Sequence, residues 1–212
     1  MGNFKHIAIQ YLQLLKYSGI DYIFFSSPIL AKMNGKYKNC QKCILANTRT
    51  NIVYGEGNEN ADLMLIGEAP GQDEDIIGRP FVGNAGQLLN KMLKAINIKR
   101  EQVYITNIVK CRPPNNRNPL PTEINACLPY LYEQIEIIKP KIILALGLVS
   151  ANTLLKTNLS LGELRKNIYN FKGIKLMVTY HPAALLYHPT WKKSAWIDLQ
   201  KLQKEYEALK KK

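Results

Sequence analysis

Four short runs of apolar residues recur along the chain, and each has the length and continuity of a strand buried on both faces. These runs are residues 62–67, 103–109, 141–147 and 175–180. Apolar residues at helical spacing occupy 84–97, 122–138 and 148–156, and a lysine-rich helical pattern follows at 191–211. Because strands alternate with helices, the pattern predicts an α/β fold in which helices cover both faces of a parallel sheet.

The chain of 212 residues is long enough for one α/β domain and too short for two. Residues 4–17 predict an amphipathic helix that ends near Gly19. We therefore expect a single domain with a helical extension over 1–35, a core over 36–200 and the end of the lysine-rich helix over 201–212.

The composition, 46% hydrophobic and 21% charged, is typical of a packed globular protein. No run of about 18 apolar residues and no signal-peptide pattern is present, so we expect a cytoplasmic protein without a membrane span. Twenty-nine lysine and arginine residues against sixteen acidic ones give a net charge of +13. This excess favours a polyanionic partner, most commonly nucleic acid, although a lysine-rich composition can also reflect an AT-rich genome.

Four cysteines are spaced in a way that suggests a metal site. Cys40 and Cys43 form a C-x2-C pair, whereas Cys111 and Cys127 follow at long range. Without a secretory signal, a metal or cluster site is a better interpretation than disulfides. The spacing suits either a zinc ion or a [4Fe–4S] cluster, and four unrelated buried cysteines are the third alternative.

Polar residues that could bind a ligand or take part in catalysis lie at the ends of three of the four predicted strands. Residues 67–71 (GEAPG) follow the first strand, Asn107 lies on the second, and His181 follows the fourth. Each has an ordinary alternative: a Gly/Pro turn, a capping side chain and a buried core histidine. Parallel strands bring their carboxyl ends to one edge, where ligands bind in such folds, so we expect one site there.

Three long segments carry a resemblance to a known family. They are GEAPGQDEDIIGRPFVGNAGQLLN, TNIVKCRPPNNRNPLPTEINAC and TYHPAALL. In this order and spacing the chain resembles the iron–sulfur, family 4 uracil-DNA glycosylases from Cys40 to Trp196. The resemblance implies a three-layer αβα sandwich around a four-stranded parallel sheet, and a [4Fe–4S] cluster on the four cysteines. It also implies excision of uracil from DNA as the first step of base excision repair.

The resemblance also assigns residues to a uracil pocket. It implies that uracil stacks on Phe81, that Asn107 reads the edge of the base, and that His181 lies beside the uracil O2 atom. Glu74 resembles the residue that crowds the C5 position and excludes the methyl group of thymine. The pocket residues carried over in this way are Gly67, Glu68, Ala69, Glu74, Phe81, Asn107, Asn116 and His181.

Glu68, Asn107 and His181 are the expected catalytic residues. His181 and Asn107 would stabilise the departing uracil anion, and Glu68 would stabilise the sugar cation or orient water. Leu185 and Leu186 are candidates to wedge into the stack that the flipped base leaves, although both could instead pack inward from a helix. Tyr187 and His188 follow where relatives usually carry an arginine, which removes one expected phosphate contact.

The expected partner is uracil-containing DNA, single- or double-stranded, and we expect a monomer without a nucleotide cofactor. One alternative is a broader family 5 type of glycosylase that also removes hypoxanthine, but Glu68 favours family 4, since family 5 relatives typically have an apolar residue there. A non-catalytic iron–sulfur module for nucleic-acid binding or redox chemistry is the other alternative. Asn107 and His181 argue against it, because binding alone needs no such pocket.

Overall fold

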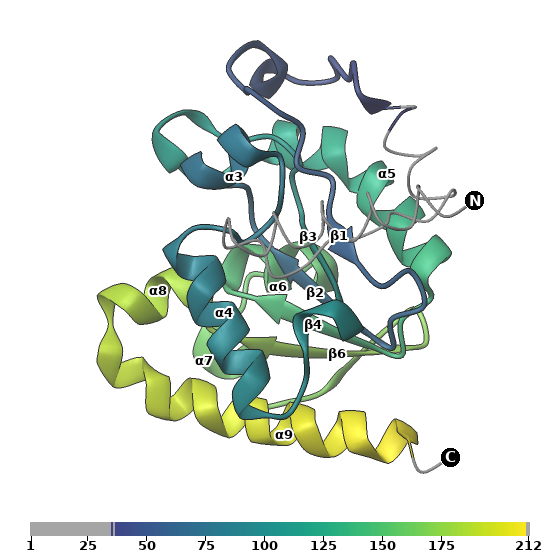
Figure 1. The fold of residues 1–212 in the computed structure, drawn as a ribbon, viewed down its shortest axis with the longest axis vertical. Helices are drawn as coiled ribbons and strands as arrows, with labels where there is room; N and C mark the ends of the chain where they lie inside the picture. The colour runs from purple at the N-terminus through teal and green to yellow at the C-terminus, as the bar shows by residue number, and fades with distance from the viewer. Residues whose placement is uncertain (1–34, 36, 211–212) are drawn as a thin grey trace, which may run out of the picture.

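A computed structural model describes residue 35 and residues 37–210 of the chain (Figure 1). The helix predicted over 4–17 lies outside the described residues, as does nearly all of the predicted extension over 1–35.

The described chain contains one mixed sheet whose six strands are ordered β1-β3-β2-β4-β6-β5. The strands are β1 (Glu56–Gly57), β2 (Leu63–Gly67), β3 (Tyr104–Asn107), β4 (Ile142–Leu146), β5 (Tyr169–Phe171) and β6 (Ile174–Thr179). The four central strands are parallel and correspond to the four predicted apolar runs. The short strands β1 and β5 extend the sheet at its two edges by antiparallel pairing, which the sequence did not predict.

Helices cover both faces of the sheet. They are α3 (Gln72–Ile77), α4 (Asn84–Ala95), α5 (Pro121–Ile138), α6 (Leu148–Leu155), α7 (Leu161–Leu164), α8 (Pro182–Tyr187) and α9 (Lys192–Lys210). Four 3-10 turns join them: η1 (Ile44–Asn47), η2 (Arg100–Gln102), η3 (Pro114–Asn116) and η4 (Pro189–Trp191). The predicted helices at 84–97, 122–138, 148–156 and 191–211 correspond to α4, α5, α6 and α9.

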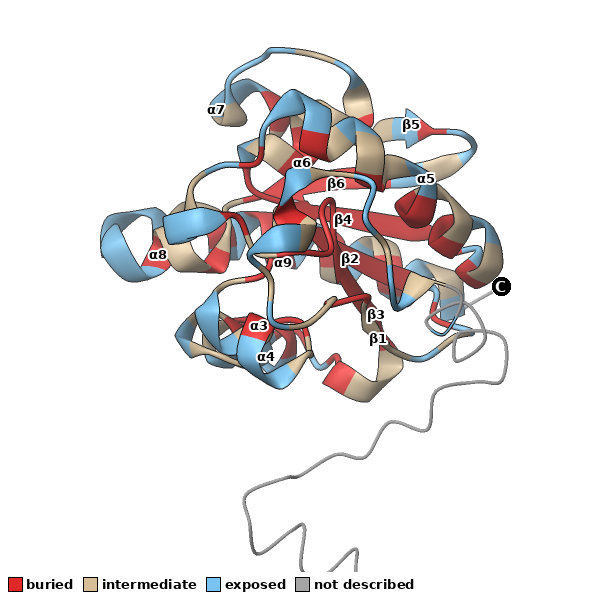
Figure 2. Cartoon of the chain, turned by 90° about the horizontal axis from the view of Figure 1, so that it is seen from above, coloured by how far each residue is buried: buried red, intermediate tan, exposed pale blue. Residues whose placement is uncertain are grey.

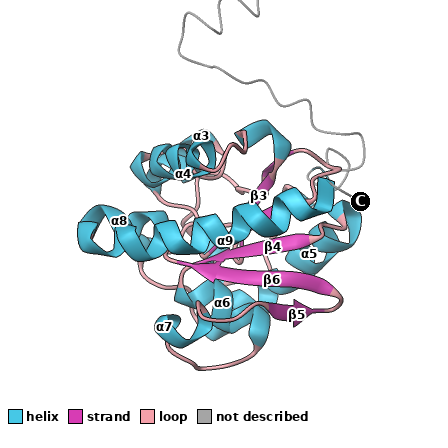
Figure 3. Ribbon diagram, turned by 90° about the horizontal axis from the view of Figure 1, so that it is seen from below, coloured by secondary structure: helices cyan, strands magenta, loops and turns pink. Residues whose placement is uncertain are grey.

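The alternation of side chains along the strands divides the core into two layers. Leu63 and Leu65 of β2 face a cluster that includes apolar residues of α4 and α9, whereas Met64 and Ile66 face a second cluster with α5, α6 and α7. Strands β2, β3 and β4 are buried along their whole length, and β6 is buried over its last four residues (Figure 2). Helix α9 runs across the sheet on the α4 face (Figure 3). The three-layer αβα prediction is therefore confirmed, with two additional edge strands.

The strand order leaves a crevice at the carboxyl edge of the sheet. Strand β2 lies at the centre, and the chain leads from it to β3 on one side, while β4 on the other side leads on to β6. The connections that leave β2 and β4 therefore diverge, which creates a ligand-binding crevice in doubly wound sheets. No helix in the described part of the chain is long and apolar enough to cross a membrane.

The close packing of α4 gives a test of the fold. A methyl group on Gly86 would overlap the backbone of Phe81, whereas on Gly162 of α7 it would have only a contact at 3.9 Å. We expect Gly86→Ala to lower the free energy of unfolding by about 1–3 kcal/mol, because backbone must move. Gly162→Ala should raise it by about 0.4–1 kcal/mol, since it removes freedom from the unfolded chain. Urea denaturation measures both, and equal effects would contradict the packing described.

Candidate active site

A cleft of about 390 Å³ opens at the carboxyl edge of the sheet. Seven of the eight residues predicted for the pocket line it, namely Glu68, Ala69, Glu74, Phe81, Asn107, Asn116 and His181. The eighth, Gly67, ends β2 and is paired with Asn107 of β3. A Cβ atom on Gly67 would overlap the Asn107 side chain and the Phe81 ring, so only glycine lets these two groups approach the strand.

The side chain of Asn107 carries an unused hydrogen-bond acceptor. Asn107 is 1% exposed, and its Oδ1 has no hydrogen-bond partner in the described part of the chain. A buried acceptor without a partner costs about 1–3 kcal/mol. Because Asn107 also lines the cleft, its Oδ1 is positioned to accept a hydrogen bond from an N–H group of a bound ligand.

A buried lysine holds the end of β3 in place. The Nζ atom of Lys110 donates to the backbone oxygen of Asn107 at 2.7 Å, to Thr106 Oγ1 at 2.6 Å and to Gln134 Oε1 at 2.7 Å. Lys110 is 1% exposed, and burial lowers its pKa to about 7. Since Gln134 lies on α5, this network fixes the strand end that carries Asn107 to a helix on one face of the sheet.

His181 lies at the N-terminal end of α8 and is neutral at pH 7. Burial lowers the pKa of its imidazole to about 4. Its Nδ1 accepts a hydrogen bond from the backbone N–H of Ala183 at 3.2 Å. A neutral imidazole that accepts at Nδ1 carries its proton on Nε2. His181 therefore offers the cleft an uncharged N–H donor.

Phe81 is at once a core residue and part of the cleft. Its side chain is 5% exposed and belongs to the apolar cluster beneath α4, and its ring centroid lies 5.6 Å from that of His181. Its backbone has φ 53°, in the left-handed region that non-glycine residues rarely adopt. Such a conformation costs on the order of 1–3 kcal/mol and persists only where surrounding contacts impose it.

Arg100 supplies those contacts. It donates from Nη1 to the backbone oxygen of Phe81 at 3.2 Å and from Nη2 to that of Pro80 at 2.6 Å. Its guanidinium also pairs with Glu56 at 2.6 Å, and Arg79 binds the same carboxylate at 2.7 Å. The buried Arg100–Glu56 pair thus holds the Phe81 turn against strand β1.

Glu74 connects two loops at the cleft. Its Oε1 accepts hydrogen bonds from the backbone N–H groups of Val82 at 2.8 Å and Gly83 at 3.0 Å, and its Oε2 accepts from that of Gly71 at 3.1 Å. Both carboxylate oxygens are therefore engaged by the protein. Glu74 has a fixed position, in which it ties the loop before α3 to the turn that carries Phe81.

Glu68 and Asn116 complete the set of predicted polar residues. Glu68 is half-buried on the loop after β2, and burial raises the pKa of its carboxyl group. Asn116 is exposed, and its Oδ1 accepts a hydrogen bond from Arg112 Nε at 2.7 Å. The loop beyond it is fixed to α5 by the pair between Arg117 and the buried Glu123.

The two candidate wedge leucines face in different directions. Leu185 is 1% exposed and belongs to the same apolar cluster as Phe81, whereas Leu186 is 43% exposed. Burial contradicts a wedge role for Leu185 in this structure, because its side of α8 lies against the apolar cluster. Leu186 remains a candidate, followed by Tyr187, which is 81% exposed.

The four cysteines line a second cavity, whose volume is about 10 Å³ in this structure. Hydrogen-bond donors approach their sulfur atoms: the N–H of Lys110 lies 3.3 Å from Cys127 Sγ, and Arg49 Nη1 lies 3.6 Å from Cys111 Sγ. Burial raises the pKa of the Cys111 thiol to about 12. The cysteines that line the cavity are Cys40, Cys43, Cys111 and Cys127.

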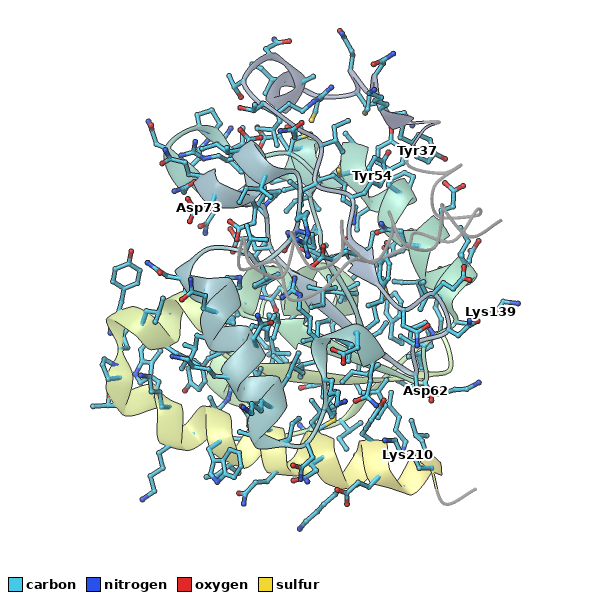
Figure 4. All side chains as sticks on the ribbon, in the orientation of Figure 1. Tyr37, Tyr54, Asp62, Asp73, Lys139 and Lys210 are labelled. Carbon is cyan, nitrogen blue, oxygen red and sulfur yellow. The ribbon has the colours of Figure 1, made fainter. Side chains whose placement is uncertain are left out.

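The geometry of this cavity bears on the group that it could hold. In the described part of the chain, no three His, Cys, Asp or Glu side chains are close enough to hold one metal ion. A single zinc ion needs its ligands at about 2.0–2.3 Å, so a larger group fits the separated thiols better. The hydroxyl of Tyr54, which lines the cavity and lies near Tyr37 (Figure 4), is buried without a partner and is available to such a group.

Sequence reasoning missed two residues that organise the cleft, Arg100 and Lys110. Lys110 had one signal in the sequence, its position between a continuous apolar run and a cysteine of the predicted metal site, where a buried lysine must be paired. Arg100 carries no such signal. Its acceptors on Glu56, Pro80 and Phe81 come from segments that are brought together only by the fold.

Comparisons with known proteins agree with this geometry. Residues 54–200 match the sequence profile of the uracil DNA glycosylase superfamily. The chain is 51% identical to the type-4 uracil-DNA glycosylase of Saccharolobus solfataricus over 78% of its length and 81% of the relative's. It is 48% identical to the type-4 uracil-DNA glycosylase of Pyrobaculum aerophilum over 76% and 86%, and 32% identical to the type-5 uracil-DNA glycosylase of that organism over 61% and 64%.

The chain therefore belongs to the uracil DNA glycosylase superfamily and, within it, to the type-4 group.

Phe81 both packs in the core and lines the cleft, so a variant is needed that separates its contribution to stability from stacking on a base. We expect Phe81→Leu to keep most of the apolar volume and to lower the free energy of unfolding by about 1 kcal/mol. Loss of the aromatic face should lower kcat/KM on uracil-containing DNA by roughly 5- to 150-fold, equivalent to about 1–3 kcal/mol of stacking on a base. Met92→Leu, in the same apolar cluster, is the matched control and should leave kcat/KM unchanged. Normal kcat/KM in Phe81→Leu would show that Phe81 only packs.

Proposed function

We propose that this protein removes uracil from DNA by hydrolysing the bond between N1 of the base and C1′ of the deoxyribose. The product is an abasic site, which begins base excision repair. The observation that carries the proposal is the unpaired Oδ1 of Asn107 in a cleft that also contains the Phe81 ring and a neutral His181. The activity named for the type-4 relatives supports it.

A direct assay tests this activity. The protein is incubated with a single-stranded oligonucleotide that contains one uracil, and the strand is then treated with alkali, which cleaves at abasic sites. Cleavage at the uracil position is expected, and a matched strand with thymine at that position should stay intact. An intact uracil strand would contradict the proposal.

The cleft can recognise uracil through complementary hydrogen bonds. Oδ1 of Asn107 would accept from the N3–H group of uracil, and the amide NH₂ of the same side chain would donate to O4. Phe81 would stack on the ring, which returns part of the energy spent when the base leaves the duplex. Glu74, fixed by its three backbone hydrogen bonds, would stand where a methyl group at C5 would need space.

Bond cleavage develops negative charge on uracil and positive charge on the sugar. The Nε2–H of His181 would donate to O2 and stabilise the departing anion, while Asn107 supports N3 and O4. A neutral donor does this without bringing its own positive charge into a buried site. The carboxylate of Glu68 would stabilise the sugar cation or orient the attacking water.

The DNA strand would bind across the mouth of the cleft. The net charge of +13 provides attraction for phosphates, so affinity should fall as salt increases. The exposed Leu186 would enter the gap that the extruded nucleotide leaves. A DNA substrate also agrees with a cytoplasmic location, and recognition of one flipped base requires only one copy of the chain.

A [4Fe–4S] cluster would be held by Cys40, Cys43, Cys111 and Cys127. Four thiolates are its usual ligands, and the lining by all four cysteines, with hydrogen-bond donors near the sulfur atoms, supports this assignment. The cluster would cross-link chain segments and take no part in the reaction, because hydrolysis of the glycosidic bond needs no electron transfer. It would join the 40–43 segment to the end of β3 and to α5.

The two alternative functions are less well supported. A broader type-5 activity is disfavoured because the chain is 48% identical to one type-4 relative and 32% identical to the type-5 relative of the same organism. Glu68 in the cleft also favours type 4. A non-catalytic module does not account for an unpaired Asn107 beside a neutral His181.

Replacement of Asn107 tests how the base is read. We expect Asn107→Asp to reduce uracil excision strongly and to shift the preference toward cytosine. An ionised carboxylate cannot donate to O4 of uracil but can accept from the amino group of cytosine, and sites based on such hydrogen bonds discriminate by ~10⁴. Rates of abasic-site formation on single-stranded uracil and cytosine oligonucleotides measure the effect.

The matched control for this variant is Asn152→Asp, since Asn152 also has a buried unpaired Oδ1 but does not line the cleft. It should keep the parental ratio of uracil to cytosine excision. If Asn107→Asp keeps that ratio as well, Asn107 does not read the base.

Metal analysis tests the cluster. Protein purified without oxygen should be brown and contain about four irons per chain, as expected for a Cys₄-ligated [4Fe–4S] centre. Cys111→Ala should lose iron and stability, whereas Ala126→Ser, a change in the wall of the same cavity, should keep both. One zinc ion per chain and no iron in the anaerobic protein would rule the cluster out.

A further inference from the structure

An aromatic side chain stands exposed at the rim of the cleft. Tyr187, the last residue of α8, lines the cleft and is 81% exposed. Among the described residues it makes no hydrogen bond or ring contact. The adjacent Leu186 is 43% exposed, so the end of α8 presents two neighbouring apolar side chains to solvent. Because these two side chains adjoin a binding cleft, they are candidates to contact a bound ligand.

The residues that follow form a column of stacked rings. The imidazole of His188 stacks on Trp191 with centroids 4.2 Å apart, and Trp191 lies 5.1 Å from the ring of Tyr180. The guanidinium of Arg165 lies over the ring of Tyr180, 4.2 Å from its centroid. Trp191 remains 38% exposed and His188 is exposed, so the outer end of the column is open to solvent.

This column is anchored to the sheet. Arg165 makes two hydrogen bonds to the buried Asp198 of α9, at 2.7 and 3.1 Å, and one to the backbone oxygen of Ser194 at 2.8 Å. Asp198 also accepts from Thr179 Oγ1, at the end of β6, at 2.8 Å. The turn that carries Tyr187 is therefore supported by a rigid base. A ligand that stacks there loses little energy to ordering the protein.

The rim of the cleft presents aromatic rings to a ligand and no unpaired cation among the residues that line it. Of the residues that line the cleft, Arg117 is the only cation, and it is paired with Glu123 at 2.6 Å. The nearest cations along the chain after Tyr187 are the exposed Lys192 and Lys193, at the start of α9. Stacking is consequently the interaction that this rim provides to a ligand. Phosphates would be bound by cations farther from the cleft, such as Lys192 and Lys193.

We propose that Tyr187, supported by His188 and Trp191, forms a stacking site for the base of a nucleotide immediately next to the extruded uracil. The inference rests on the proposed uracil excision, which places the DNA strand at this rim. A base has an apolar face whatever its identity, so the site accepts any flanking sequence. Stacking also needs no partner strand, so the site favours uracil in single-stranded DNA.

A cycle of protein and substrate variants tests this site. Single-stranded oligonucleotides with one uracil carry either a normal base or a stable abasic analogue at the position immediately 5′ or 3′ of it. For the unchanged protein, loss of the flanking base on one side should raise KM about tenfold. Tyr187→Ala should raise KM about tenfold on the complete strand. Its KM should then be the same on the strand that lacks the flanking base. Tyr187→Phe should behave like the unchanged protein.

Salt dependence provides an independent readout. Tyr187→Ala removes no charge, so the slope of log KM against log salt concentration should not change. Tyr187→Arg should make the slope steeper by about 0.7, the value for one additional phosphate contact on a single strand. The matched control is Trp196→Ala, an aromatic residue of α9 that is 40% exposed and does not line the cleft, and it should change neither readout.

Failure of the stacking site and failure of uracil excision give different results in these experiments. Equal KM increases for Tyr187→Ala on strands with and without the flanking base, or no increase on any strand, would overturn the stacking site. Absence of uracil release by the unchanged protein would contradict uracil excision instead. In that case fluorescence anisotropy with the same labelled oligonucleotides still decides whether Tyr187 stacks on a base.

Discussion

The hydrogen bonds of one buried lysine connect the two halves of this site. Lys110 donates to the backbone oxygen of Asn107, to Thr106 and to Gln134 on α5, and the next residue is Cys111 of the cysteine cavity. The segment that begins at the last residue of β3 thus contains Asn107, which we propose reads the base, the lysine that positions it and a proposed cluster ligand. Only a few bonds of this segment therefore separate the cysteine cavity from the cleft.

The cleft maintains two costly features that serve binding better than stability. Oδ1 of Asn107 is buried without a partner, and Phe81 has a left-handed backbone. Each costs on the order of 1–3 kcal/mol in the free protein. Lys110 and the Arg100–Glu56 pair hold these residues in place. A bound uracil would satisfy the acceptor and cover the ring, so part of the cost would be recovered only when the substrate arrives.

The sequence predicted the central sheet, its main helices and the polar residues at its carboxyl edge, because buried parallel strands are continuous apolar runs whose ends share an edge. It did not predict β1 and β5, which are too short to show a period and form only by pairing with longer strands. It could not tell which of Leu185 and Leu186 faces the core, since that depends on how α8 packs. The engagement of Glu74 by three backbone N–H groups and the role of Arg100 depend on loops that meet only in the folded chain.

The central claim is that the unpaired amide oxygen of Asn107 exists to bind the N3–H group of uracil. The most direct measurement is a crystal structure of the protein with uracil bound. We expect Asn107 Oδ1 to lie within hydrogen-bond distance of N3, the uracil ring to lie on Phe81, and His181 Nε2 to approach O2. Uracil bound outside the cleft, or an Asn107 Oδ1 paired with a protein group or with water while N3 bonds elsewhere, would contradict the claim.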